Sequence, residues 1–217
     1  MQESKTREKI LKKIRQALTH KTVSPYPQPD FETNIYASAP EEKEELFATQ
    51  LRKLNGHFLF CTDELEAMEQ IILLAEKNKW SRFLCREKQI KDLLDKCGLP
   101  YSEEFSAPGE GTVGISLCEF LVARTGSVIM SSMQLSGRRL TVYPDFHIVI
   151  ARSSQLVPDM KTALTGIKAK YGDQIPSMIT AITGPSRTAD IEKTLVQGAH
   201  GPKEIFVFLL DDNNGKR

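Results

Sequence analysis

Residues 57–78, HFLFCTDELEAMEQIILLAEKN, place a short apolar run directly before an amphipathic helical pattern. The run from His57 to Cys61 has the length and aromatic content of a buried strand, and Asp63 to Asn78 repeats apolar side chains at helical spacing. The same order recurs at once, with an apolar run from Arg82 to Cys85 and a helical pattern from Glu87 to Cys97. Strands that alternate with helices are typical of a parallel sheet with crossover helices. This region therefore predicts an α/β fold.

The alternation continues to either side of this region. Glu41 to Leu54 is a helical pattern with acidic residues in its first turn, where they favour the positive end of the helix dipole, and Val113 to Cys118 is a further apolar run. The last third of the chain adds a helix at Pro158 to Lys170, a strand at Met178 to Ile182, a helix at Thr188 to Val196 and a strand at Ile205 to Leu210. We expect a mainly parallel sheet flanked by helices.

The middle of the chain has a different pattern. Its short strand-like runs are joined by turns without an intervening helix: Phe120 to Val122, Ser127 to Met130, Leu140 to Tyr143 and His147 to Ile150. This pattern predicts a β-rich insertion in the α/β layer.

The N-terminal region is expected to form a separate arm. Lys5 to His20 is an amphipathic helical pattern, and Thr22 to Pro40 contains four prolines, a composition typical of an extended linker. We therefore predict an arm at residues 1–40 and one α/β domain at 41–212. The helix could pack on its own domain or on a partner, and the sequence leaves both open.

Composition and charge favour a cytoplasmic protein that binds neither nucleic acid nor membrane. The chain has 217 residues, enough for one large domain, and its formal net charge is +1. Met1 to Ile10 is charged and lacks the apolar core of a signal peptide. The longest apolar run, Ile205 to Leu210, is much shorter than the roughly 20 residues of a membrane span.

The four cysteines do not have the spacing of a metal or cluster motif. Cys61, Cys85, Cys97 and Cys118 contain no C-x-x-C pair, so we expect no iron–sulfur cluster, zinc site or other cofactor on this chain. Cys61, Cys85 and Cys118 lie in apolar strand-like runs and are expected to be buried.

The strongest candidate for a binding site is the segment from Thr183 to Asp190, TGPSRTAD. It would leave a strand and enter a helix, where Gly184 permits a tight turn and Ser186 or Thr188 can cap the helix. The free N–H groups of that helix and the guanidinium of Arg187 would then suit a small anion, beyond the carboxyl end of a strand. The alternative is a capped helix with an exposed arginine.

A second candidate is the segment Gly198-Ala199-His200-Gly201-Pro202. Gly198 is placed to end the preceding helix, and His200 would lie in the loop before the last strand, where it could donate or accept a proton. Whether His200 reaches the Arg187 site depends on how this loop folds back. The alternative is a histidine that bonds the loop backbone.

Further candidates are Thr125, Gly126 and Ser127, which form a turn that presents two hydroxyl groups. His147 starts a strand after another turn and could face a ligand, although histidines at such positions are more often satisfied structurally. Arg138 and Arg139 are expected in a solvated turn.

One familiar motif is discounted. Residues 109–114 match the G-x-G-x-x-G pattern of dinucleotide-binding proteins, but here the pattern precedes a strand and no helix follows it. We interpret it as a loop.

These segments, in this order, resemble the LUD domain. The resemblance is carried by Gly184 to Glu192, by Leu195 to Pro202 and by Thr125 to Ser127, together with Pro144 and His147. It covers the second half of the chain in sequence and the first half in layout. It implies a fold similar to that of CoA transferases and ribose-5-phosphate isomerase. It also implies membership in a three-protein bacterial system that oxidises L-lactate to pyruvate, in which the other two proteins carry the iron–sulfur cysteines.

The chain departs from this family at Arg124, where many relatives have Glu before the Thr-Gly pair. A carboxylate function at that position would be missing here, and an arginine would favour an anionic ligand.

Three hypotheses follow. The first is an accessory subunit of lactate oxidation that binds a small anionic ligand or iron–sulfur partner subunits without redox centres of its own. The second is a free-standing enzyme of the isomerase or acyl-transfer type that acts on a phosphorylated or CoA-linked molecule; Arg187 would hold the anion, and His147 or His200 would move protons. The third is a regulatory or assembly protein that docks through Lys5 to His20. The motifs identify no catalytic nucleophile, and a homodimer is expected only because two-fold assemblies are common.

Overall fold

The computed structural model describes residues 2–19, 23, 25, 28, 30, 33, 36, 42–104, 111–188, 196–198 and 200–212. It separates into two compact units, Met1–Ser38 and Ala39–Arg217. The first unit contains helix α1 (Gln2–Thr19), whose apolar side chains Ile10, Leu11, Ile14 and Leu18 are exposed on one face. All other elements belong to the second unit.

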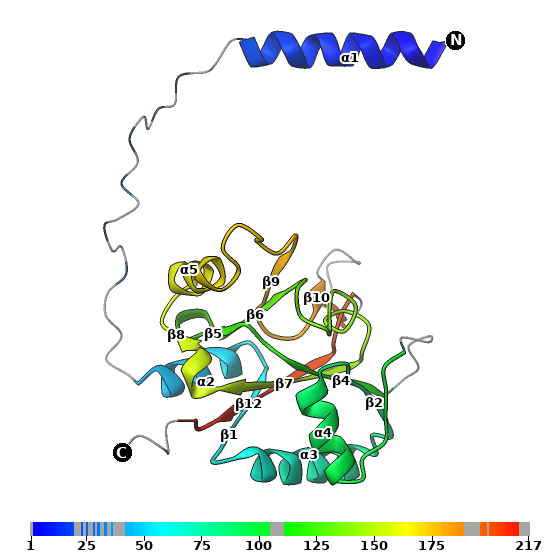
Figure 1. Cartoon of the computed structure of the whole chain (residues 1–217), viewed down its shortest axis with the longest axis vertical. Coiled ribbons are helices and arrows are strands. Elements are labelled where there is room, and N and C mark those ends of the chain that lie inside the picture. Colours follow the sequence, from blue (N-terminus) through cyan, green and yellow to red (C-terminus); the bar gives the residue numbers. More distant parts are fainter. Residues whose placement is uncertain are drawn as a thin grey trace. The chain divides into compact units, whose positions relative to one another are not determined.

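A six-stranded sheet forms the centre of the second unit (Figure 1). Its strands lie in the order β1 (His57–Cys61), β12 (Glu204–Leu210), β7 (Phe146–Arg152), β4 (Thr112–Leu117), β2 (Arg82–Leu84) and β3 (Tyr101–Ser102). Every pair in this sheet is parallel. All strands therefore end at one edge, here called the carboxyl edge, and begin at the opposite amino edge.

Two helices cover one face of this main sheet. These are α3 (Glu64–Asn78) and α4 (Lys88–Lys96), which lie below the sheet in Figure 1. The Asp63 side chain caps α3 by accepting a hydrogen bond of 2.9 Å from the N–H of Glu66. Buried side chains such as Ile71, Ile90 and Phe208 fill the space between these helices and the sheet.

The other face of the main sheet packs against α2 (Lys43–Lys53) and a second sheet. The second sheet has the order β8 (Leu156–Val157), β5 (Phe120–Val122), β6 (Ser127–Ser131) and β9 (Ile179–Ile182). Two 3₁₀ turns, η1 (Ala123–Thr125) and η2 (Ser153–Gln155), adjoin it. Helix α5 (Met160–Tyr171) covers its outer face through Ala163 and Ile167. The expected fold class, a mainly parallel sheet flanked by helices with a β-rich insertion, is confirmed.

Three sequence expectations need correction. The strand at Ile179 to Ile182 belongs to the second sheet, where it pairs antiparallel with β6. Leu140 to Tyr143 forms turns instead of a strand, and the N–H groups of Val142 and Tyr143 both donate to the Arg139 carbonyl. Only Leu140 and Thr141 of this run are buried, so the run lacks the continuous apolar burial of a core strand. Where a helix was expected from Thr188 to Val196, the described ends belong to two short strands, β10 (Arg187–Thr188) and β11 (Val196–Gln197).

The cysteines behave as expected from their apolar surroundings. Cys61, Cys85 and Cys118 are buried and free, and burial raises the pKa of each thiol, to about 11 for Cys61 and about 12 for Cys85. They act as small core side chains.

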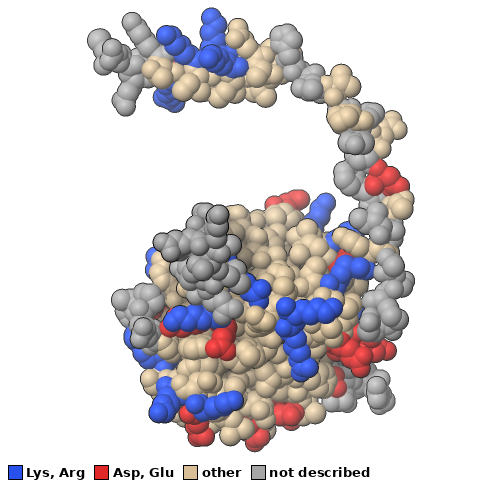
Figure 2. All heavy atoms as spheres, turned by 180° about the vertical axis from the view of Figure 1, so that it is seen from behind, with Lys and Arg blue, Asp and Glu red and all other residues tan. Residues whose placement is uncertain are grey.

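Within the described residues, no helix has the length and apolar character needed to cross a membrane. Lys and Arg side chains are interspersed with Asp and Glu over the face of the second unit that Figure 2 shows.

Candidate functional site

Three hydroxyl groups from the predicted segments form a cluster. The Ser127 hydroxyl is a hydrogen-bond partner of both the Thr125 hydroxyl, at 2.7 Å, and the Thr183 hydroxyl, at 2.8 Å. Ser127 is buried, whereas Thr125 and Thr183 are exposed. The turn between β5 and β6 and the end of β9 are therefore joined at this cluster.

Two glycines bring this cluster against the C-terminal end of α2. Gly126 has a φ of 61°, and a Cβ there would lie 2.5 Å from the backbone nitrogen of Leu51. Gly184 has a φ of 85°, and a Cβ there would lie 2.9 Å from the Cβ of Leu54. Only glycine fits such approaches. The Arg187 guanidinium donates to the Leu54 carbonyl, where it caps α2.

The two C-terminal motifs also lie side by side. The Ser186 N–H donates to the Pro202 carbonyl at 2.9 Å, and the Gly198 N–H donates to the Ser186 carbonyl at 3.0 Å. His200 is exposed in this second segment. The structure thus brings together nearly all of the predicted site residues, which we call the motif surface: Thr125, Gly126, Ser127, Thr183, Gly184, Ser186, Arg187, Thr188 and His200.

The local backbone differs from the predicted helix start. Arg187–Thr188 forms strand β10, which pairs antiparallel with β11 (Val196–Gln197). Residues 189–195 lie outside the described part of the chain. Thr188 and Val196 are β-branched, which favours strand geometry, and pairing satisfies N–H groups that a helix start would leave free. The helix-based anion site therefore does not form at Ser186 to Thr188.

The motif surface lies at the amino edge of the main sheet. Leu54 precedes β1, and Pro202 precedes β12. The turn at Gly184 does follow a strand, as expected, but that strand belongs to the second sheet and ends near the start of the parallel strands. The turn therefore lies beyond the carboxyl end of a strand, as expected, but not at the carboxyl edge of the parallel sheet, where ligands of such folds usually bind.

His147 lies apart from the motif surface, between the two sheets. It is fully buried on β7, and its Nε2 lies 2.8 Å from the Ser116 hydroxyl on β4. Burial lowers the pKa of His147 to about 4, so the ring is neutral at pH 7. Its Nδ1 has no hydrogen-bond partner among the described residues.

A cleft of about 390 Å³ opens at the carboxyl edge of the main sheet. The ends of β4, β7 and β12 form its floor with Leu117, Ile150 and Leu210. Its walls are formed by the starts of α3 and α4, the end of β7 with the adjoining η2, the loop after β6 and the end of α5. The side chains of these walls include Glu64, Glu87, Gln89, Ile90, Leu93, Met133, Gln134, Leu135, Arg152, Gln155, Lys170 and Tyr171. In parallel α/β sheets this edge is the usual place for a ligand.

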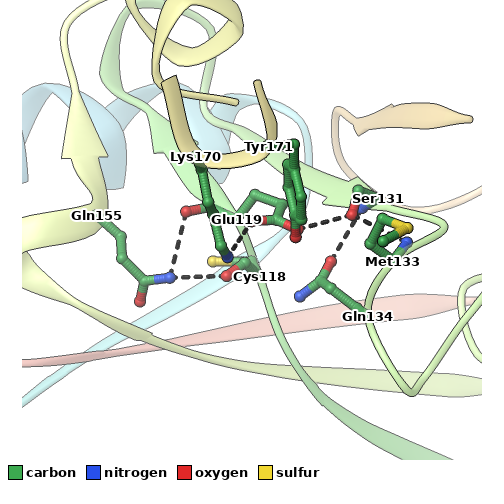
Figure 3. A network of polar contacts seen from close by, with 8 residues as sticks. All are labelled: Cys118, Glu119, Ser131, Met133, Gln134, Gln155, Lys170 and Tyr171. Atoms are coloured by element: carbon green, nitrogen blue, oxygen red, sulfur yellow. Dashed lines mark hydrogen bonds and ion pairs between the residues drawn. The ribbon is translucent and has the colours of Figure 1, made fainter. Parts of the chain in front are cut away.

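A buried carboxylate organises one wall of this carboxyl-edge cleft (Figure 3). Glu119 accepts hydrogen bonds from the Ser131 hydroxyl at 2.6 Å, the Lys170 ammonium at 2.7 Å and the Tyr171 hydroxyl at 2.7 Å. Burial acts to raise the pKa of Glu119, but the bonds from Lys170, Ser131 and Tyr171 outweigh it and leave the pKa below its usual value. Glu119 is therefore ionised, and it fixes the direction of Lys170 and Tyr171.

Two glutamine side chains complete this wall of the cleft. The Gln134 Oε1 accepts from the Ser131 N–H at 2.9 Å, whereas no described residue accepts from the Gln134 amide nitrogen. Gln155 uses its amide nitrogen on the carbonyls of Cys118 and Glu119 and its oxygen on the N–H of Arg152.

The other acidic residues of the cleft wall are held by their neighbours. Glu64 pairs with Arg152 at 2.7 Å, and one oxygen of Glu87 accepts from the Ser136 N–H at 3.1 Å. The second oxygen of Glu87 is buried and has no partner among the described residues. None of these groups forms a metal site, since the described residues contain no cluster of three or more His, Cys, Asp or Glu placed to hold an ion.

A smaller cavity of about 240 Å³ lies beside β2 and β3 at the amino edge, lined by Arg82, Tyr101 and Tyr143 among others.

Comparison with known proteins shows what the second half of the chain is similar to. Residues 109–210 match the family model of the LUD domain. This part of the chain resembles a LUD domain. It is similar to lactate utilization protein C of Bacillus licheniformis, at 37% identity over 112 residues that cover 51% of this chain and 47% of that protein. The protein of the same name from Bacillus subtilis gives the same values, and the uncharacterized protein YkgG of Escherichia coli is 33% identical over 113 residues, with 51% and 49% covered. The resemblance predicted from the motifs is confirmed.

The matched segment spans about half the length of these curated relatives. A solved structure, that of a DUF162 family protein from Deinococcus radiodurans, superimposes with a TM-score of 0.57 over 79% of this chain and 99% of that chain. At 18% identity this likeness shows the shared fold alone.

The sequence did not reveal the polar wall of the carboxyl-edge cleft. Glu119, Gln134 and Lys170 are far apart along the chain, and only the folded chain brings them together. One local signal was present: Glu119 interrupts an otherwise apolar run from Leu117 to Val122, and an acid in such a place is generally buried with a partner.

Proposed function

We propose that this chain is an accessory component of a bacterial lactate-utilisation system, and that the motif surface is where it contacts iron–sulfur partner subunits. The proposal is supported by the similarity of the LUD domain to proteins named lactate utilization protein C. On this proposal the protein works in the cytoplasm.

The observation that carries the proposal is the convergence of three motif segments at one end of α2. Thr125, Thr183 and His200 are all exposed on that surface, while glycines and backbone bonds fix the segments beneath them. The Arg187 guanidinium is already used on the Leu54 carbonyl. An exposed polar surface, with no enclosed cavity among the described residues that form it, fits a protein–protein contact better than a small-molecule site. A small anion bound at Arg187 is the competing possibility.

Growth with L-lactate as the only carbon source tests the proposal. A strain that lacks the gene should fail to grow on lactate but grow normally on pyruvate, and the wild-type gene should restore growth. His200→Glu, which places a carboxylate on the motif surface, should not restore it. Lys168→Glu, a charge change of the same sign at an exposed position of α5, should restore it fully.

Co-purification distinguishes a surface that binds partner subunits from a site that binds a small anion. The tagged chain, co-expressed with its candidate iron–sulfur partners, should retain them, and His200→Glu should release them. Normal growth of the deletion strain on lactate would refute the role in lactate utilisation. Loss of growth without loss of partners would instead favour a ligand at the motif surface.

A further inference from the structure

We propose that the carboxyl-edge cleft binds a carboxylate with an apolar body larger than the methyl group of lactate. This site lies at the opposite edge of the main sheet from the motif surface, and the inference does not depend on the proposed function. It rests on the hydrogen-bonding state of the polar wall, on the apolar floor and on the size of the cleft.

In the polar wall around Glu119, the hydrogen-bonding groups left without a partner are donors, whereas the acceptors are already bonded. The Lys170 ammonium has three N–H groups and uses one on Glu119, so two remain. The Gln134 amide nitrogen has two N–H groups and no described partner, and Figure 3 shows it directed away from Ser131, to which its oxygen is bonded. The oxygens of Glu119 and Gln155 are already bonded within the protein. The unpartnered oxygen of Glu87 lies on the other side of the cleft, at the start of α4, and is itself buried. At the polar wall a ligand therefore meets donors, and a carboxylate beside an ammonium supplies the matching acceptors best.

Glu119 gives this wall its fixed geometry. Only 1% of its side chain is exposed, whereas 56% of the Lys170 side chain is exposed. Partial burial by itself would lower the pKa of Lys170. The hydrogen bond to Glu119 and the charge of Glu119 outweigh this effect, so the pKa of Lys170 is raised. Lys170 therefore stays charged and points in one direction before any ligand arrives, which reduces the ordering cost of binding.

The floor and rim of the cleft are apolar. Leu117, Ile150 and Leu210 end the three central strands, and Ile90 and Leu93 extend the apolar surface along α4. Met133 and Leu135, which line the cleft from the loop after β6, are 52% and 62% exposed. Such side chains are matched by a hydrocarbon or aromatic group on the ligand.

The size of the cleft argues against lactate itself as the occupant. A volume of about 390 Å³ falls in the range of roughly 300–1,000 Å³ found for sites that enclose larger organic ligands. A three-carbon acid would leave most of the apolar surface in contact with water. A branched or aromatic acid would cover it.

Titration calorimetry on the full chain tests this directly. The probes are L-lactate, 2-hydroxy-4-methylpentanoate, 3-phenyllactate and the uncharged amide of 3-phenyllactate. We expect the two larger acids to bind at least about tenfold more tightly than lactate, because they bury more apolar surface. The amide should bind at least about tenfold more weakly than 3-phenyllactate, because it lacks the charge that Lys170 recognises.

Two isosteric or near-isosteric variants locate the site. Gln134→Glu keeps an oxygen for the Ser131 N–H but replaces the donating amide with a negative charge, and Lys170→Met removes the ammonium while keeping the length of the side chain. Each should weaken the binding of 3-phenyllactate at least about tenfold. Gln174→Glu and Lys168→Met make the same changes at exposed positions nearby and should leave the affinity unchanged.

The thermal midpoint of each variant shows whether it is folded. If Lys170→Met is unfolded, Gln134→Glu alone decides the question. Equal affinities for lactate and the larger acids, no saturable binding of any acid at millimolar concentration, or binding of 3-phenyllactate that survives the substitutions would each overturn the proposal. Growth on lactate reports on the motif surface separately, so a failure here leaves that proposal standing.

Discussion

The carboxylate of Glu119 lies 2.7 Å from the ammonium of Lys170, and the two ends of this pair differ sharply in exposure, at 1% and 56% of the side chain. Two further donors, the hydroxyl groups of Ser131 and Tyr171, reach the same carboxylate. The pair joins the start of β5 to the end of α5 across the second sheet. Its buried end supports structure, and its exposed end is available to a ligand.

Glu119→Gln should destabilise the fold by about 2 kcal/mol, because hydrogen bonds to a charged group contribute more than those to a neutral amide. The solvent around Lys170 moderates the loss. Urea unfolding measures the change. The matched control is Glu103→Gln, which breaks the exposed pair with Lys91 and should cost much less, because solvent screens that pair. Equal losses in the two variants would contradict the role assigned to the Glu119 network.

His147 should make the protein less stable in acid. Its pKa in the folded state is lowered to about 4 from an ordinary 6.5, so the unfolded chain binds the additional proton between these values. Above pH 6.5 His147 is neutral in both the folded and the unfolded chain, and its titration does not affect the free energy of unfolding. Below pH 6.5 the free energy of unfolding falls by about 1.4 kcal/mol for each pH unit, down to about pH 4. The urea unfolding free energy, measured at several pH values, should show this slope.

His147→Gln should flatten that slope, since glutamine retains a nitrogen for the Ser116 hydroxyl but does not titrate in this range. His200→Gln is the control, because the exposed His200 is not part of the buried pair. A slope that is unchanged in His147→Gln would assign the acid sensitivity to other groups, such as Glu119.

Local patterns predicted most elements but not how they pair. The apolar run from His57 to Cys61 and the capped helix after it are recognisable in isolation, because their period and boundary residues are local. The sheet to which Ile179–Ile182 belongs is decided by pairing with Val128–Ser131, about fifty residues earlier, and no local pattern contains that information. The same is true of Arg187–Thr188, whose partner strand lies beyond the undescribed segment.

The candidate site residues likewise include some that short motifs predict and some that only the folded structure identifies. The glycine and hydroxyl residues of the motif surface were recognisable because each motif is short and continuous. The position of these residues at the amino edge could not be predicted, because it depends on the sheet that β9 joins. Lys170 and Gln134 carry no motif, and they became candidates only when the hydrogen bonds around Glu119 were known.

Gly126→Ala should be strongly destabilising. A Cβ there would lie 2.5 Å from the Leu51 nitrogen and 2.8 Å from the Gln50 carbonyl carbon, and a backbone helix cannot move as a flexible side chain can. We expect a loss of about 3 kcal/mol or more, which combines the cost of a left-handed residue with that of moving α2. Gly98→Ala has a similar φ of 68° but open space around it, and should cost only about 1 kcal/mol. Thermal and urea unfolding of both variants would show whether contact with α2 accounts for the difference.

Arg187→Gln tests whether this arginine supports the fold as well as the motif surface. Its guanidinium donates to the Leu54 carbonyl at the C-terminal end of α2, where a positive charge also favours the helix dipole. Removing both effects should reduce the unfolding free energy by about 1 kcal/mol. Arg139→Gln, at an exposed arginine outside the motif surface, should leave it unchanged. If Arg187→Gln is as stable as the wild type but loses its partner subunits, the guanidinium acts at the interface and not on α2. If the variant is less stable but retains its partner subunits, Arg187 supports the fold, and His200 is the better residue with which to test the contact.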